Sequence, residues 1–229
     1  MGEGSLMRAF ACAALALCFV SCSGRDDAKV IQSISNDNAT TAADSNVKRG
    51  VKPEPDSQAV VLEVESGGFS YGRIVIELYP NVAPKMVERF KKLVGEGFYN
   101  GTAFHRVSVS TGVVQGGDPN SKDDDPSNDG MGGSPYPDVP AEFSDIPYER
   151  GIVGAARSQD VNSANSQFFI TLRRVPMWDN NYTVFGRVIE GIDNAQTIAG
   201  APTRPSNPEN PADKIIIKSA TLQPRANFK

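Results

Sequence analysis

Apolar and polar positions alternate in two neighbouring stretches of the chain, residues 59–64 and 72–78. Both stretches are rich in β-branched side chains, and this combination is typical of half-buried strands. The segment between them contains Ser66-Gly67-Gly68, and glycine readily adopts the backbone angles that a tight hairpin turn requires. We therefore expect a β-hairpin here.

The apolar period changes to that of a helix soon after the hairpin. Apolar side chains recur at helical spacing over residues 86–94. Pro84 stands where the first turn of a helix tolerates proline, and Gly95 ends the run. This pattern predicts an amphipathic helix that packs on the sheet. A second, shorter helix is expected over residues 192–199, because Gly200 follows it directly.

Short apolar runs separated by long loops make up most of the remaining chain. The loops are rich in Gly, Pro, Asn and Asp, which favour turns. Many short strands with few helices favour a closed antiparallel barrel, and the sequence has no internal repeat. The runs comprise residues 113–114, 151–156, 168–172, 183–188 and 214–222.

The start of the chain has the pattern of an export signal. Arg8 precedes an apolar run over residues 9–20, which at about a dozen residues is too short to span a bilayer but suits the core of a signal peptide. The run ends in Phe19-Val20-Ser21-Cys22, which resembles the lipobox of bacterial lipoproteins. By this resemblance residues 1–22 are a signal peptide and Cys22 becomes the lipidated first residue.

Two interpretations of this start remain open. In the first, the protein is exported and held by its lipid anchor on a membrane, facing the periplasm or the cell exterior, because several acyl chains give stable anchoring. In the second, the segment is an ordinary secretory peptide and Cys22 is lost or inert. Residues 23–57 are rich in Ser, Asn, Asp, Thr and Ala and predict a flexible polar linker. A folded domain over 58–224 and a C-terminal tail over 225–229 complete the expected organisation.

Composition narrows the functional classes. With 39% hydrophobic and 22% charged residues, the chain resembles a soluble globular protein. The formal net charge of -4 and the lack of a Lys/Arg cluster argue against nucleic acid as a partner. Cys12, Cys18 and Cys22 are the only cysteines, so disulfide, zinc or thiol chemistry is excluded from the expected domain. No metal or other cofactor is expected, and nothing demands more than a monomer.

Four segments, in order, resemble the cyclophilin family of peptidyl-prolyl cis-trans isomerases. Each is weak alone, but together they are specific, and the likeness extends over roughly residues 59–222. The resemblance implies a mainly β fold, a closed eight-stranded antiparallel barrel capped by two α-helices, with substrate in a groove outside the barrel wall. The segments are Phe104-His105-Arg106-Val107, Gln115-Gly116-Gly117-Asp118-Pro119, Ser166-Gln167-Phe168-Phe169-Ile170 and Tyr182-Thr183-Val184-Phe185-Gly186.

The same resemblance implies the activity and the residues that carry it. Arg106 is implied as the fixed cation directed at the prolyl nitrogen, and Gln115 as the group that orients it. Phe169 is implied as the aromatic floor of a proline pocket. Proline-containing polypeptides are the implied partners. The remaining implied substrate-binding positions are Val113, Trp178, Met177, Ala156, Arg157, Gln167 and Tyr182.

The chain also departs from the family. Gly112 stands where the family has a phenylalanine of the proline pocket, after a loop over residues 108–112 that is one residue longer than usual. Met177-Trp178 replaces the usual Trp-Leu, which argues against tight cyclosporin binding. Our hypothesis is that Trp178 fills part of the space that Gly112 leaves open.

Two further features are assigned structural roles. His105 is the only histidine, but isomerisation transfers no proton to substrate carbon or oxygen, so we interpret it as structural rather than as a general base. Asp125, Ser127 and Asp129 mimic the start of a calcium loop, yet Tyr136 stands where the closing glutamate should be. We therefore favour a solvated surface loop.

Two functions are carried forward. The first is an isomerase that accelerates proline-limited folding of exported proteins, favoured by Arg106, Gln115 and Phe169. The second is a catalytically weak module or chaperone that holds proline-containing segments in the same groove, favoured by Gly112 and the longer loop.

Overall fold

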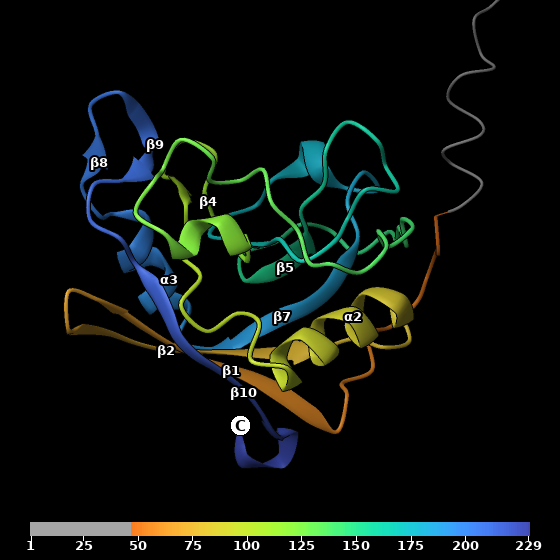
Figure 1. Ribbon diagram of the computed structural model, residues 1–229. Coiled ribbons are helices and arrows are strands. Elements are labelled where there is room, and N and C mark those ends of the chain that lie inside the picture. Colours follow the sequence, from red (N-terminus) through yellow and green to blue (C-terminus); the bar gives the residue numbers. More distant parts are fainter. Residues whose placement is uncertain (1–46) are drawn as a thin grey trace, which may run out of the picture. The chain divides into compact units, whose positions relative to one another are not determined.

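The computed structural model describes residues 47–229 and shows a mainly β domain with two α-helices (Figure 1). The predicted signal peptide, Cys22 and most of the predicted linker lie outside the described residues. The strands are β1 (Gln58–Ser66), β2 (Phe69–Leu78), β3 (Arg106–Ser108), β4 (Val113–Gly116), β5 (Ile152–Ala155), β6 (Phe168–Thr171), β7 (Val184–Glu190), β8 (Thr203–Arg204), β9 (Asn207–Pro211) and β10 (Ile216–Pro224). The helices are α2 (Pro84–Gly95) and α3 (Ile192–Ala199), with 3-10 turns at η1 (Pro119–Lys122), η2 (Pro176–Trp178) and η3 (Arg225–Asn227).

The first hairpin is confirmed. Strands β1 and β2 pair antiparallel, and the chain turns at Gly67 and Gly68, both with positive φ (54° and 86°). Two consecutive positive φ angles match the right-handed twist of the flanking strands, and glycine adopts them without steric cost.

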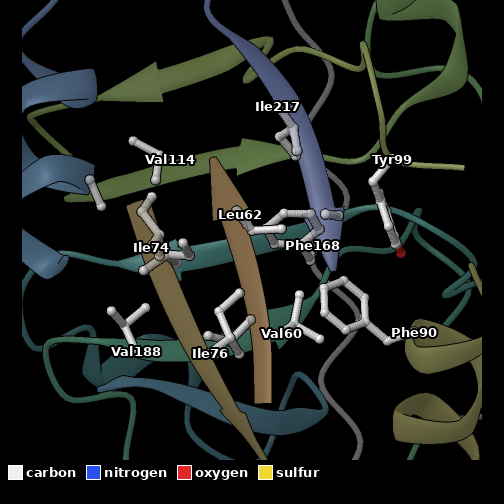
Figure 2. Packing of buried hydrophobic residues seen from close by; sticks show 14 of the residues in the cluster. Val60, Leu62, Ile74, Ile76, Phe90, Tyr99, Val114, Phe168, Val188 and Ile217 are labelled. Atoms are coloured by element: carbon white, nitrogen blue, oxygen red, sulfur yellow. The ribbon is translucent and has the colours of Figure 1, made fainter. Parts of the chain in front are cut away.

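Both predicted helices are confirmed and they cover the sheet. Helix α2 contacts β7 and β10, whereas α3 contacts β2 and β4 (Figure 1). Phe90 of α2 lies 5.3 Å from the ring of Phe168 and 5.1 Å from that of Phe185. Figure 2 shows Phe90 and Phe168 within the core, together with Leu62 and Ile76 from the first hairpin. Burial of the apolar face therefore fixes α2 on the sheet.

The expectation of a closed barrel is wrong. Eight antiparallel strands form one curled sheet in the order β10-β1-β2-β7-β5-β6-β4-β3, so β10 and β3 are its two edges. The segment before β3 runs beside β10, where Gly101 and Phe104 donate backbone hydrogen bonds to Ile217 and Ile215. Ile217 in turn donates to the carbonyl of Thr102 at 2.8 Å, while the amide of Ala103, on the side away from β10, donates to Ser121 Oγ at 2.8 Å. This segment therefore forms one isolated bridge with β10, between Ala103 and Ile216, and no continuous ladder joins β10 to β3 itself.

Both ends of the described chain pack on the domain. Lys48 Nζ donates to the carbonyl of Val82 at 2.7 Å, and Asp56 pairs with Lys91 at 2.8 Å, so part of the segment expected as linker makes specific contacts. In the segment expected as a tail, Arg225 pairs with the buried carboxylate of Glu77 in β2, at 2.6 Å. No helix within residues 47–229 has the length and apolar character needed to cross a membrane.

Candidate active site

Cross-strand register places three of the predicted site residues side by side. Arg106 of β3 is the direct partner of Gln115 of β4, and Gln115 is in turn the partner of Phe169 of β6. Phe169 also pairs with Gly154 of β5. Directly opposed residues of antiparallel strands point to the same face, with Cβ atoms about 4.5–5.5 Å apart. The sheet therefore builds a continuous row across four strands.

This row lies on the face opposite the main core. Side chains alternate along a strand, so Phe168 and Ile170 point into the main core while Phe169 points to the other face. Val113 and Val114 of β4 divide in the same way. The period of two that buries the core thus also presents the candidate site on the outer face of the sheet.

A polar chain runs from Arg106 into the neighbouring loop. Arg106 Nη1 donates to Gln115 Oε1 at 3.4 Å, and Gln115 Nε2 donates to Gln167 Oε1 at 3.0 Å. Gln167 Nε2 then donates to the carbonyls of Gly130 and Gly132, at 2.9 and 2.8 Å. These bonds order the two amide side chains and leave their orientation little freedom.

An aromatic cluster adjoins the polar chain. The ring of Phe169 lies 4.8 Å from Trp178, 5.6 Å from Tyr182 and 5.7 Å from Tyr148. Arg157 stacks on Tyr182, with its guanidinium carbon 4.5 Å from the ring centroid. Phe169 is only 4% exposed, whereas Trp178 and Tyr182 are half-buried. A proline ring bound here would therefore contact the rims of Trp178 and Tyr182 as well as Phe169.

A cleft of about 430 Å³ extends the site beyond the polar chain. Gly130 and Gly132 form one wall, and the segment after β5 forms the other. Ala156 is held at this wall because its amide donates to the carbonyl of Gln167 at 2.9 Å. The cleft is large enough for a side chain that flanks a bound proline. Its polar lining includes Gln115, Ser134, Asp138, Arg157, Asn165 and Gln167.

The remaining predicted residues lie near this site with different exposure. Val113 is fully buried behind Phe169, and Met177 is 76% exposed in the turn before Trp178. A Cβ at Gly112 would lie 2.5 Å from Cγ of Arg173, so Arg173 occupies the space beside Gly112. Our hypothesis that Trp178 fills this space is therefore not what the structure shows.

His105 is buried beside the site and not within it. Burial lowers the pKa of His105, although the charge of Asp118 opposes this in part. Both ring nitrogens lack a hydrogen-bond partner among the described residues. The imidazole is consequently neutral near pH 7, in line with a structural role.

Three residues near the site were not identified from the sequence. Tyr148 stacks on Phe169 from a loop without any periodic pattern. Gly154 is required beneath Phe169, because a Cβ there would lie 2.3 Å from Cζ of that ring. Glu209 of β9 lies 2.8 Å from Arg106, although the two residues are more than a hundred positions apart in the chain. The sequence signal for Glu209 is an acidic residue in a Pro-rich stretch. That pattern is not specific for a functional site.

The comparison with known proteins decides the family. The family model described as "Cyclophilin type peptidyl-prolyl cis-trans isomerase/CLD" matches residues 60–222. The chain belongs to the cyclophilin family. As in other members of this isomerase family, its activity is the cis-trans isomerisation of X-Pro bonds.

Named relatives agree with this assignment. The chain is 49% identical over 169 residues to a "Probable peptidyl-prolyl cis-trans isomerase" of Brucella suis, with 72% of this chain and 82% of the relative covered. It is 36% identical over 157 residues to the "Peptidyl-prolyl cis-trans isomerase ppi1" of Schizosaccharomyces pombe, with 67% and 95% covered. Both relatives carry the name of the enzyme, which favours the isomerase over the holding module.

Solved cyclophilins share the fold. A crystal structure of a cyclophilin-type isomerase from Cryptosporidium parvum matches with a TM-score of 0.63 and 30% identity, covering 72% of this chain and 97% of the other. A second structure of that protein, determined in the presence of the dipeptide Ala-Pro, matches with a TM-score of 0.62 and 30% identity, with 72% and 98% covered.

Proposed function

We propose that this cyclophilin isomerises X-Pro bonds with Arg106, Gln115 and Phe169 as its central residues, and that it does so for exported polypeptides at a membrane surface. The observation that carries the site assignment is the register of β3, β4 and β6, which sets these three residues in one row. The N-terminal pattern that ends at Cys22 supports export and anchoring.

The chemistry requires weakening of amide resonance. Partial double-bond character gives the C–N bond a rotational barrier of about 18–20 kcal/mol, so uncatalysed prolyl isomerisation takes tens of seconds or longer. In the twisted state the prolyl nitrogen becomes pyramidal and carries a lone pair. A fixed cation beside that nitrogen stabilises the twisted state more than the planar one, and only such a difference accelerates the reaction.

Arg106 suits this role by charge and by position. Its guanidinium stays ionised and presents donors in one plane. Gln115 holds one side of that plane, and Phe169 lies on the next strand of the row, so a proline ring against the aromatic cluster brings its nitrogen toward Arg106. The backbone of residues 156–157 supplies further hydrogen-bonding groups for an extended substrate.

The anchoring proposal has a direct test. Cells that express the full chain are fractionated beside cells that express Cys22→Ala, with Cys18→Ala as the matched control. We expect the wild type and Cys18→Ala in the membrane fraction and Cys22→Ala in the soluble exported fraction. Retention of Cys22→Ala on the membrane would exclude the lipid anchor.

The folding role is tested with the full chain purified in mild detergent. A secreted protein whose slow refolding phase is limited by proline isomerisation serves as substrate. We expect catalytic amounts of the chain to accelerate that slow phase and to leave the fast phase unchanged. Acceleration of short peptides without any effect on the slow phase would count against a folding role.

A further inference from the structure

The β8–β9 hairpin has no role in the site as described so far. It is inserted between α3 and β10 (Figure 1). Strand β9 contacts β3, the edge strand that carries Arg106. Thr203 pairs with Pro211 and Arg204 with Asn207, so the chain reverses over only two residues. The hairpin therefore meets the sheet at the end of the site row.

Hydrogen bonds fix this hairpin to the backbone next to Arg106. Asn210 is 7% exposed, and its Nδ2 donates to the carbonyl of His105 at 3.2 Å. Its Oδ1 accepts from Nε of Arg204 at 2.8 Å, which ties the two strands of the hairpin together. Glu209, next to this buried amide, is thereby held at a defined place beside β3.

Glu209 and Gln115 contact different donors of the same guanidinium. Glu209 Oε2 accepts from Nε of Arg106 at 2.8 Å, while Gln115 Oε1 accepts from Nη1 at 3.4 Å. Nη2 makes no hydrogen bond among the described residues. Two partners at different edges of a planar group fix its orientation, and the third nitrogen stays available to a ligand.

The ion pair contributes little to folding. Both side chains are 37% exposed, and pairs this accessible to water typically contribute little to stability. The hydrogen bond from Arg106 also holds the pKa of Glu209 below its usual range, so the carboxylate is ionised near neutral pH. An ionised pair that adds little to stability is better suited to orienting Arg106 than to holding the fold together.

We propose that Glu209 is a positioning residue for the isomerase, which holds the Arg106 guanidinium through Nε so that its free edge faces the prolyl nitrogen. The proposal rests on Arg106 as the cation of the reaction. It makes the hairpin that carries Glu209 part of the catalytic apparatus, although Glu209 itself touches no substrate atom.

The primary test compares isomerisation rates of an X-Pro peptide for the wild type, Glu209→Gln and Glu209→Ala. We expect kcat/KM to fall roughly tenfold in Glu209→Ala, mainly through kcat, because small errors in the placement of a catalytic group are costly. Glu209→Gln keeps an acceptor for Nε and should retain more activity than Glu209→Ala. Glu190→Ala removes a comparably exposed ion pair, with Arg73 at 2.6 Å, and is the matched control that should behave as wild type.

A second arm separates positioning from a general structural effect. In the Arg106→Ala background, Glu209→Ala should cause no further loss of activity, because the group it positions is absent. Heteronuclear NMR should also show that the Nε–Hε signal of Arg106 shifts in Glu209→Ala while the backbone amides of β6 stay in place.

The possible results separate a failure of the Glu209 proposal from a failure of the proposed activity. An inactive wild type would contradict the proposed site before Glu209 is considered. With an active wild type, the positioning role is overturned if Glu209→Ala keeps or raises kcat/KM, or if its loss persists in the Arg106→Ala background. An unchanged Arg106 Nε–Hε signal in Glu209→Ala would overturn it as well.

Discussion

Trp178 packs against Phe169, with ring centroids 4.8 Å apart and ring planes at 64°. Trp178 therefore lies against the residue that the family resemblance implies as the aromatic floor of the proline pocket. Because the space beside Gly112 is filled by Arg173, the departures from the family at Gly112 and Trp178 have separate structural consequences. Gly112 changes the loop, and Trp178 changes the pocket wall.

Trp178→Ala should lower the catalytic efficiency. Aromatic pairs contribute about 0.5–1.5 kcal/mol beyond the area they bury, and the indole contacts both Phe169 and Tyr182. We expect kcat/KM for an X-Pro peptide to fall roughly three- to tenfold. Phe69→Ala, a substitution of an 80% exposed aromatic residue in the first hairpin, is the control. Equal turnover in the two variants would mean that the indole is not part of the pocket.

Gly112→Ala should destabilise the fold. Gly112 has a positive φ of 69°, and a Cβ would lie 2.5 Å from Arg173 Cγ. Backbone strain of this kind costs about 1–3 kcal/mol, so the melting temperature should drop measurably. Gly95→Ala has open space and no positive φ, and it should match or exceed the wild type. A Gly112→Ala protein as stable as Gly95→Ala would refute this account of the loop.

Asp118→Ala should release the glycine-rich wall of the cleft. The Asp118 carboxylate is fully buried and accepts hydrogen bonds from the amides of Asn120, Gly130 and Gly132. Losing bonds to a charged group typically costs about 1.5–3 kcal/mol each, so the free energy of unfolding should fall by at least that amount. Amide hydrogen exchange at Gly130 and Gly132 should become faster. Asp125→Ala, in the exposed part of the same loop, is the control with little expected effect.

His105 should make stability depend on pH near neutrality. Its folded-state pKa lies below the unfolded value of 6.5, so the unfolded chain binds the proton more readily. Its contribution is therefore fully present above pH 6.5 and is lost as the pH falls toward the folded-state pKa. We expect the free energy of unfolding to drop more between pH 7.5 and about 5.5 in the wild type than in His105→Gln. Identical pH slopes would show that His105 does not titrate differently on folding.

Periodicity predicted the elements whose stability is local. Helix α2 and the first hairpin combine a clear apolar pattern with proline or glycine at the ends, and both have the expected bounds within a few residues. Strand β3 was missed, because three residues that begin with Arg106 carry no period. The hairpin around Glu209 was missed for a different reason, since tertiary contacts with His105 and Arg106 define it.

The absence of barrel closure is another feature that the sequence pattern could not predict. Strand count and alternation favoured a closed barrel, but closure depends on whether two particular edges share a continuous ladder. Here the segment before β3 pairs with β10 only through the isolated bridge between Ala103 and Ile216, and β3 itself begins at Arg106. Whether that contact extends into a ladder depends on the three-dimensional path of residues 101–105, which a linear pattern does not encode.

The most direct test of the account is prolyl isomerisation of a short X-Pro peptide by the full chain, measured beside Arg106→Ala and Arg150→Ala. Arg150 pairs with Asp193 away from the site row, at 2.8 Å, and controls for the loss of one surface charge. We expect wild type and Arg150→Ala to accelerate the reaction equally, and Arg106→Ala to lose a hundredfold or more, on the order of one catalytic electrostatic contact. Undiminished catalysis by Arg106→Ala would contradict the central role of the row formed by Arg106, Gln115 and Phe169.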